Sequence, residues 1–203
     1  SRNRAGQIKV YSTQASCTND NNSTNNTNVV AKAVVKYSLV RKFTNSDRYM
    51  QLTINPSTVL NSVGQQKKGS TNCWSLAMAY GVYILSDGKT KASTTSTAWS
   101  SYNVGSYTAV DGSTSSVSTI WTLIKKKIGG GIPVVLQVKN QWSATHWVLV
   151  YGYNVNAGNV TSESVLMKNI KVIDPTGSYG VANGIDTAKT LHSSRATRTW
   201  NKK

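Results

Sequence analysis

The sequence predicts an α+β domain in which one buried helix packs on an antiparallel β-sheet. The first observation is the segment between Asn72 and Ser86, which is apolar on nearly every side of a helix. Such a helix is buried all round rather than lying at the surface. The second observation is that β-type segments follow at 132–138, 145–153 and 169–174. A helix followed by consecutive strands favours a helix packed on a sheet.

The boundaries of the buried helix follow from local signals. Asn72 is expected to be its N-cap, Cys73 to open its first turn, and residues 86–88, Ser-Asp-Gly, to stop it. A second helix is expected to begin near Val117, with apolar residues at i, i+3, i+4 and i+7, and to end at the glycines 129–131.

The N-terminal part of the chain shows a change of character near residue 28. Residues 1–28 are rich in Asn, Thr and Ser and contain almost nothing to bury, so we expect a flexible arm. Residues 29–40 and 49–54 are β-branched and alternating, so we expect two strands in a hairpin. Pro56 is expected to end the second strand.

A single domain is therefore expected over residues 29–203. Within it we distinguish a strand extension at 29–63, a core at 64–180 and a basic tail at 181–203. No apolar run reaches the length of a membrane span, so no transmembrane segment is expected.

The strongest compositional feature is positive charge. The chain has 23 Lys and Arg against 7 Asp and Glu, a formal net charge of +16. Such a surface attracts anionic partners such as lipid, teichoic acid or nucleic acid. No zinc knuckle, aromatic RNA-binding signature or helix-turn-helix accompanies the charge, so a solvated positive surface is favoured over a nucleic-acid reader.

Cysteine and histidine are scarce and scattered. Cys17 lies in a polar stretch and Cys73 opens the apolar helix, while His146 and His192 are distant from both cysteines and from each other. A disulfide between the two cysteines would require an oxidising compartment. The spacing fits no metal site, and we predict no metal and no cofactor.

Three residues combine into a chemical pattern. Cys73 stands at a helix start, where the helix dipole favours a thiolate, His146 stands at a strand start, and Asp174 ends the next strand. Antiparallel pairing of those two strands would bring His146 and Asp174 together. Thiol catalysis requires such a set: a nucleophile, an imidazole that moves the proton, and an acid that orients the imidazole.

The segments around these residues resemble a known family. The run Asn-Cys-Trp-Ser at 72–75 with its apolar helix, and the strand His-Trp-Val-Leu-Val-Tyr-Gly-Tyr at 146–153, are similar to the papain-like cysteine peptidase clan. The runs 172–177, with an Asp-Pro turn, and 131–135 are most similar to its bacterial branch, the peptidases that process bacteriocin precursors at double-glycine sites. The resemblance covers about residues 64–180.

The resemblance implies a papain-like fold and a role for each residue. Cys73 would be the nucleophile, His146 the general base and acid, and Asp174 the residue that orients the histidine. The clan places a glutamine of the oxyanion hole six residues before the cysteine, where this chain has Lys67. We take Gln66 as the donor, with the Cys73 backbone amide as the second.

Each of these residues also has an ordinary structural explanation. A lone cysteine is often a small buried hydrophobe, a histidine heading a core strand is often only a satisfied core residue, and Asp before Pro is a common turn. The three together, in this order, favour a thiol-catalytic site, and with the resemblance they imply a secreted or exported bacterial cysteine peptidase that acts on a protein or peptide. The alternatives are a toxin or effector that deamidates glutamine, transfers acyl groups or cleaves cell-wall peptide amides, and an inactive basic module that binds an anionic polymer.

Overall fold

The computed structural model describes residues 10–11, 29–31, 41–44, 48–112, 116–139 and 145–203. The chain divides into two compact units, residues 1–40 and 41–203. In the first unit, β1 (Val10–Tyr11) pairs antiparallel with β2 (Val29–Ala31). Apart from β1, the arm expected at residues 1–28 lies outside the described residues.

The second unit is built on one large β-sheet. Its strands follow the order β3-β4-β7-β6-β11-β5, and β8 pairs with β7, β9 with β8, and β10 with β6. All these pairings are antiparallel. The strand bounds are β3 Arg41–Thr44, β4 Tyr49–Leu52, β5 Tyr107–Asp111, β6 Val134–Lys139, β7 Thr145–Asn154, β8 Ile170–Ile173, β9 Tyr179–Val181, β10 Thr190–Leu191 and β11 Thr197–Lys202.

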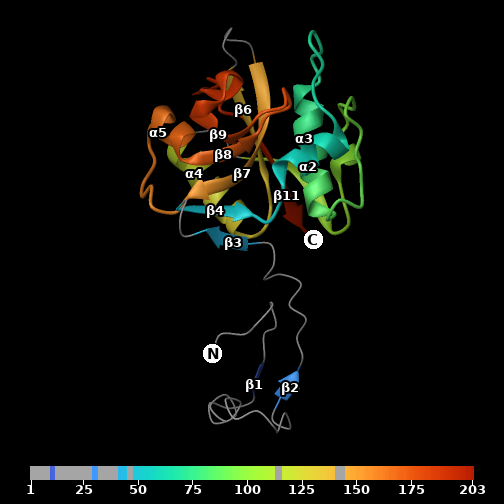
Figure 1. Ribbon diagram of the computed structural model, residues 1–203, viewed down its shortest axis with the longest axis vertical. Helices are drawn as coiled ribbons and strands as arrows, with labels where there is room; N and C mark the ends of the chain where they lie inside the picture. The colour runs from blue at the N-terminus through green and yellow to red at the C-terminus, as the bar shows by residue number, and fades with distance from the viewer. Residues whose placement is uncertain (1–9, 12–28, 32–40, 45–47, 113–115, 140–144) are drawn as a thin grey trace. The chain divides into compact units, whose positions relative to one another are not determined.

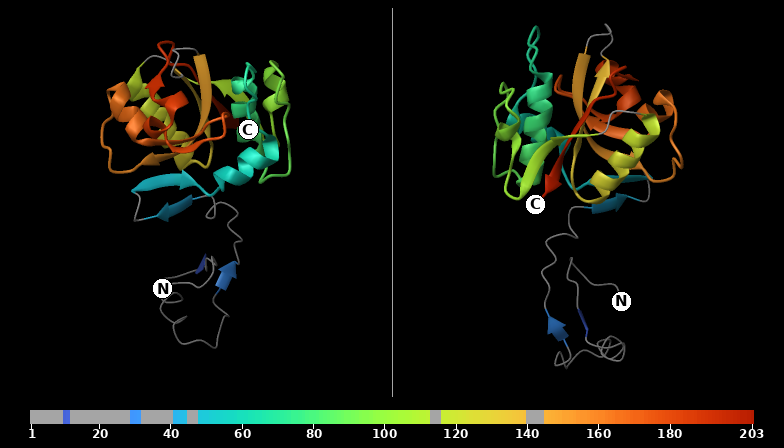
Figure 2. Two further views of the ribbon diagram at one scale, coloured as in Figure 1. Left: turned by 45° about the horizontal axis from the view of Figure 1, so that its top comes forward. Right: turned by 180° about the vertical axis from the view of Figure 1, so that it is seen from behind.

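Helices cover the sheet on two sides. The α-helices are α2 Pro56–Val63, α3 Cys73–Leu85, α4 Val117–Gly129 and α5 Glu163–Lys168, and the 3₁₀ helices are η4 Trp99–Tyr102, η5 Ala182–Gly184 and η6 Asp186–Ala188. Figures 1 and 2 show α2 and α3 on one side of the central strands, and α4 on the other. The predicted α+β class is confirmed. None of the described helices is long and apolar enough to cross a membrane.

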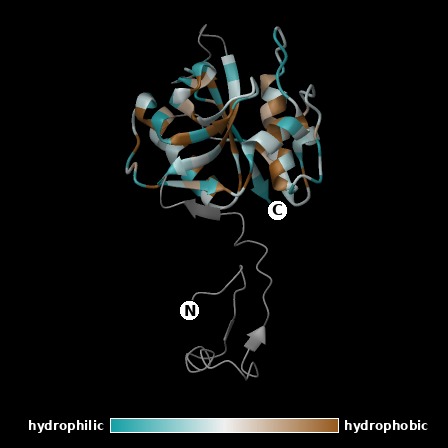
Figure 3. Ribbon diagram, in the orientation of Figure 1, coloured by the Kyte–Doolittle hydropathy of each residue, from teal (hydrophilic) through white to brown (hydrophobic). Residues whose placement is uncertain are grey.

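The core lies between α3 and the central strands. Cys73 and the whole stretch 75–82 of α3 are buried, as the apolar pattern predicted. The hydrophobic residues gather on α3 and the central strands, whereas the outer loops are mostly hydrophilic (Figure 3). Gly81 of α3 lies directly against the indole of Trp200 in β11, and that indole is fully buried. Helix and sheet are therefore in close contact at this glycine.

Helix α2 was not predicted, although the sequence carries its signal. Pro56 follows the strand that it is expected to end, and it is also the first residue of α2. The side chain of Asn55 accepts hydrogen bonds from the amides of Ser57 and Thr58, at 3.1 and 3.4 Å. An N-cap asparagine followed by proline is a typical helix start, because proline has no amide hydrogen to satisfy there.

The strands at either end of the second unit also differ from the prediction. The hairpin partner of β4 is β3 (Arg41–Thr44) rather than a strand over residues 29–40, of which only β2 (Val29–Ala31) is described. Strand β4 pairs with β7, so this hairpin belongs to the main sheet and is not an extension of it.

The segment 181–203 is not a tail. It contributes β10 and β11, and β11 lies between β6 and β5 in the sheet. The indole nitrogen of Trp200 donates to the carbonyl of Tyr102 at 2.8 Å. The composition of this strand does not indicate it, because the strand is basic and two of its three buried residues, Thr197 and Thr199, are polar, with Trp200 the third.

The contact between α3 and β11 generates a test of the core. A Cβ at Gly81 would lie 2.0 Å from the Trp200 ring, so Gly81→Ala must displace a buried indole. We expect a loss of about 1–3 kcal/mol in the free energy of unfolding, measured by denaturant titration. Gly129→Ala is the matched control, because nothing lies within 4 Å of a Cβ in that helical position. An equal stability for the two variants would contradict this packing.

Candidate active site

Cys73 is held at the N-terminus of α3. It is a free thiol, buried to 8% exposure, in the first residue of the helix. Asn72 occupies the predicted N-cap position, but its side chain makes no capping bond. It accepts instead from the Ser70 hydroxyl at 2.5 Å and donates to the Thr94 carbonyl at 3.0 Å. Asn72 thus joins two loops beside the cysteine and leaves the first helix amides to other acceptors.

The register of β7 and β8 brings the histidine to the aspartate. His146 is the second residue of β7, and Leu149 of β7 pairs with Ile173 of β8. Asp174 directly follows β8, so it lies beside the start of β7, as the predicted antiparallel pairing requires. His146 Nε2 is 2.8 Å from Asp174 Oδ1, and the side chains are 5% and 0% exposed. Because Nε2 binds the aspartate, Nδ1 is the ring nitrogen that can interact with the Cys73 sulfur.

Two threonines that the sequence analysis did not assign complete the surroundings of Asp174. The amide and the hydroxyl of Thr176 donate to Oδ1 at 2.8 and 2.7 Å. The hydroxyl of Thr187, in η6, donates to Oδ2. Thr176 belongs to the Asp-Pro-Thr-Gly turn and could have been found there, since short polar side chains stabilise such turns. Thr187 lies in a stretch with no motif, so no local signal pointed to it.

The turn after Asp174 requires glycine. Gly177 has φ +105°, donates its amide to the Asp174 carbonyl at 2.9 Å, and would place a Cβ 2.6 Å from Gln65 Oε1. Glycine alone adopts this conformation without strain and leaves room for the glutamine. The backbone therefore holds the carboxylate in place from both sides, because the Asp174 amide also donates to the carbonyl of Ser178 at 2.8 Å.

The histidine and the aspartate stabilise each other's charged forms. Burial is the largest influence on the pKa of His146 and would lower it, but the hydrogen bonds and charges of Asp174 and Cys73 act against burial and raise the pKa to about 9. Burial likewise would raise the pKa of Asp174, but His146, Thr187 and Thr176 hold that pKa below its usual range. At neutral pH the site therefore contains an imidazolium and a carboxylate.

Gln66 lies at the same site. Its backbone amide donates to the Pro175 carbonyl at 2.7 Å, and its side-chain Nε2 donates to the Ser70 carbonyl at 2.5 Å. Nε2 keeps a second N–H, and Oε1 is buried without a hydrogen-bond partner among the described residues. The loop before Cys73 thus fixes the orientation of the Gln66 amide, because only its nitrogen can donate to the Ser70 carbonyl.

Three of the site residues predicted from the sequence line one cavity. A cavity of about 590 Å³ is lined by Gln66, Cys73 and His146, together with Lys67, Lys68, Gly69, Ser70, Thr71, Thr145, Thr176 and Thr187. Asp174 lies behind His146 and is fully buried. The structure therefore brings together all four residues that the sequence predicted, three on the cavity and one behind the ring.

The remaining cysteine and histidine have other positions. Cys17 lies outside the described residues. His192 contacts the hydroxyls of Thr145, through Nε2 at 3.3 Å, and Ser194, through Nδ1 at 2.8 Å. In the part of the chain that the structure describes, no group of three or more His, Cys, Asp and Glu side chains could hold a metal ion.

Comparison of this chain with protein-family models, with curated proteins and with solved structures finds no match. The interpretation of the cavity therefore rests on its own residues. A thiol next to an imidazole whose far nitrogen is held by a buried carboxylate can make the sulfur a nucleophile and carry a proton to a leaving group.

The raised pKa of His146 can be measured directly. The chain has two histidines, so proton NMR of the His192→Ala variant observes the His146 ring alone. We expect the His146 titration near pH 9. Asp174→Asn removes the negative charge that favours the imidazolium, so the pKa should fall by at least about one unit. A His146 titration near its ordinary 6.5 in the unmodified protein would contradict the electrostatic description.

The hydrogen bond from Thr187 to Asp174 gives a second test, of the stability of the protein in acid. Because the folded-state pKa of Asp174 lies below its ordinary 3.8, its contribution to stability is present above 3.8 and is lost as the pH falls through the folded-state value. Thr187→Val removes a donor, raises that pKa and leaves Oδ2 unpaired, at a cost of about 1–3 kcal/mol. Acid unfolding followed by circular dichroism should then begin at a higher pH.

The control is Thr190→Val, because the side chain of Thr190 is exposed in β10. An acid midpoint that is the same in both variants would show that Thr187 does not support the carboxylate.

Proposed function

We propose that this protein is a thiol-dependent hydrolase with a papain-like arrangement of its site, and that it cleaves peptide bonds through an acyl-thioester. The observation that carries the proposal is the buried chain from Cys73 through His146 to Asp174, which opens onto the cavity of about 590 Å³. The helix with the nucleophile on one side and the antiparallel strands with histidine and aspartate on the other support the same proposal.

The first half of the reaction forms the acyl-enzyme. The Cys73 sulfur, as thiolate, attacks the carbonyl carbon of the scissile bond, and a new C–S bond forms while the carbonyl oxygen takes up the negative charge. When the tetrahedral intermediate collapses, the C–N bond breaks. His146 gives its Nδ1 proton to the leaving amine, so the amine departs neutral and the acyl group remains on the sulfur.

The second half returns the enzyme to its starting state. Neutral His146 accepts a proton from water as the water oxygen attacks the thioester carbon. The C–S bond then breaks, the carboxylic acid product leaves, and the sulfur and imidazolium are restored. Asp174 stays ionised throughout and keeps the ring in the orientation in which Nδ1 faces the sulfur.

We propose two donors for the developing oxyanion. One is the second N–H of Gln66 Nε2, whose other N–H is fixed on the Ser70 carbonyl. The other is the backbone amide of Cys73, which as a first-turn amide has no acceptor within the helix. Removal of one such donor typically lowers kcat by about 10²–10³-fold.

The proposal is tested with peptide libraries and matched single variants. Cys73→Ala should abolish cleavage, and His146→Ala should lower its rate by about 10²–10⁴-fold, since the proton transfer is lost. Cys17→Ser and His192→Ala are the matched controls and should cleave like the unmodified protein. Cleavage that survives in Cys73→Ala would overturn the proposal.

The product separates hydrolysis from related thiol chemistry. Peptide cleavage leaves a new amine end, deamidation releases ammonia, and acyl transfer joins the acyl group to an added amine. New amine ends that appear only when Cys73 is present support a peptidase. Ammonia release or transfer without cleavage would replace it with a deamidase or an acyltransferase.

A further inference from the structure

Two lysines line the cavity at Cys73, and the part of the lining that the structure describes contains no acidic residue. Lys67 and Lys68 line it, and the third basic group, His146, is paired with Asp174. The carboxylate of Asp174 is fully buried behind His146 with both oxygens occupied. Neither lysine has an ion-pair partner within the described ranges.

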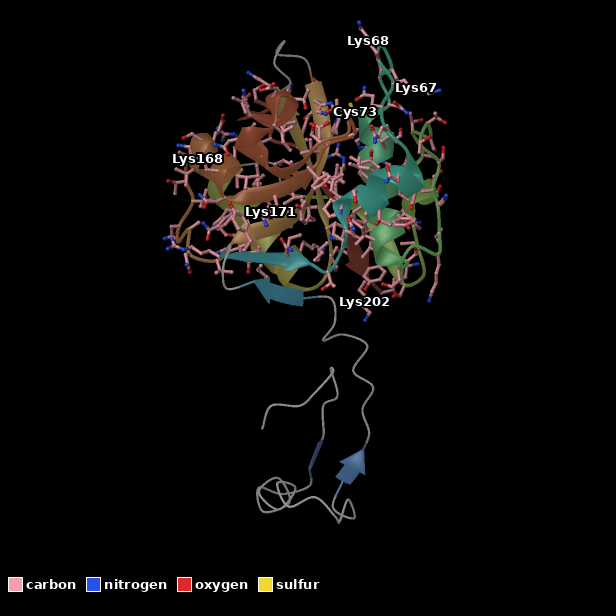
Figure 4. All side chains as sticks on the ribbon, viewed as in Figure 1. Lys67, Lys68, Cys73, Lys168, Lys171 and Lys202 are labelled. Atoms are coloured by element: carbon pink, nitrogen blue, oxygen red, sulfur yellow. The ribbon has the colours of Figure 1, made fainter. Side chains whose placement is uncertain are left out.

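The loop that carries the lysines is fixed to the body of the protein. The Ser70 amide donates to the Lys67 carbonyl at 3.0 Å and closes a turn, and the Gln66 side chain donates to the carbonyl of Ser70. The Gln66 amide is attached to the Pro175 carbonyl, next to the buried aspartate. Figure 4 shows Lys67 and Lys68 on the loop that extends beyond the end of α3 where Cys73 lies. The backbone of this loop is therefore held beside the cavity, and the side chains of Lys67 and Lys68 are exposed on it.

The other walls of the cavity are small and polar. Besides the residues already named, they are formed by Gly69, Ser70, Thr71, Thr145, Thr176 and Thr187. Among the residues that the structure describes, no large apolar side chain lines the cavity, so burial of an apolar side chain against them gains little. Hydroxyl groups and ammonium groups together are suited to an anionic group that keeps part of its hydration.

We infer that the substrate is an acidic peptide, with a Glu or Asp side chain beside the scissile bond that binds at Lys67 and Lys68. This inference rests on the proposed function, because it names the substrate of the same thiol. The peptide backbone would lie over Cys73 and His146, and the carboxylate would lie at the rim. A carboxylate within ion-pair distance of an exposed ammonium is attracted to it, and salt weakens this attraction.

Two small electrophiles test the charge of the site without a substrate. Iodoacetate is anionic and iodoacetamide is neutral, while both alkylate the same sulfur. We expect Lys67→Gln/Lys68→Gln to lower the ratio of the iodoacetate rate to the iodoacetamide rate at Cys73 by about threefold or more at low salt. Peptide mapping by mass spectrometry separates Cys73 from Cys17.

The control removes the same charge elsewhere. Lys89 and Lys168 are both exposed and do not line the cavity, so Lys89→Gln/Lys168→Gln should leave the ratio unchanged. An equal ratio in the two double variants, with Cys73 still alkylated by iodoacetamide in a His146-dependent manner, would overturn the acidic-substrate inference and leave the proposed function intact. If iodoacetamide does not alkylate Cys73 in a His146-dependent manner, both the acidic-substrate inference and the proposed function are wrong.

Protection by peptides tests the substrate class. A Glu-rich peptide should slow the reaction of Cys73 with iodoacetamide at least severalfold more than the matched Gln peptide, and Lys67→Gln/Lys68→Gln should remove the difference. Equal protection by the two peptides would overturn the inference. Protection by an oligonucleotide of equal charge but not by the Glu-rich peptide would also overturn it, in favour of a nucleic-acid partner.

Discussion

The hydrogen bond between His146 and Asp174 is the interaction on which the site depends. Both side chains are buried, and burying an unpaired charge costs much free energy. Each charged group is therefore stabilised by the other. The 2.8 Å contact, with three further donors from Thr176 and Thr187, satisfies the carboxylate completely enough for it to stay ionised. Loss of one partner of such a pair typically costs about 3–5 kcal/mol, because the other is left buried and uncompensated.

Cys73, the third residue of the site, comes from a part of the chain far from His146 and Asp174. Strands β7 and β8 fix the histidine and the aspartate by their register alone, whereas Cys73 depends on how α3 packs against the sheet. Helix α3 packs mainly on β7, the strand that carries His146, and Gly81 of α3 also meets Trp200 of β11. Residues from the helix, the middle strands and the last strand must all be in place before sulfur and imidazole meet. The site is therefore a property of the whole second unit.

The sequence alone predicted those parts that local patterns mark strongly. Helices α3 and α4 and strands β6, β7 and β8 lie within about two residues of their expected bounds, because long apolar or periodic segments leave little choice.

Other parts depend on long-range contacts and carry weaker signals. Strand β11 is short and basic, and only its pairing with β5 and β6 makes it a central strand. Thr187 reaches Asp174 only through the fold, and helix α5 is a short element within a polar loop.

The most direct test of the proposed site is a crystal structure of the protein after reaction with a peptidyl electrophile. It should show the electrophile bonded to the Cys73 sulfur, with His146 Nδ1 facing that sulfur and Gln66 Nε2 within hydrogen-bond reach of the adduct oxygen. An unmodified Cys73, or an adduct from which His146 and Gln66 are both turned away, would contradict it.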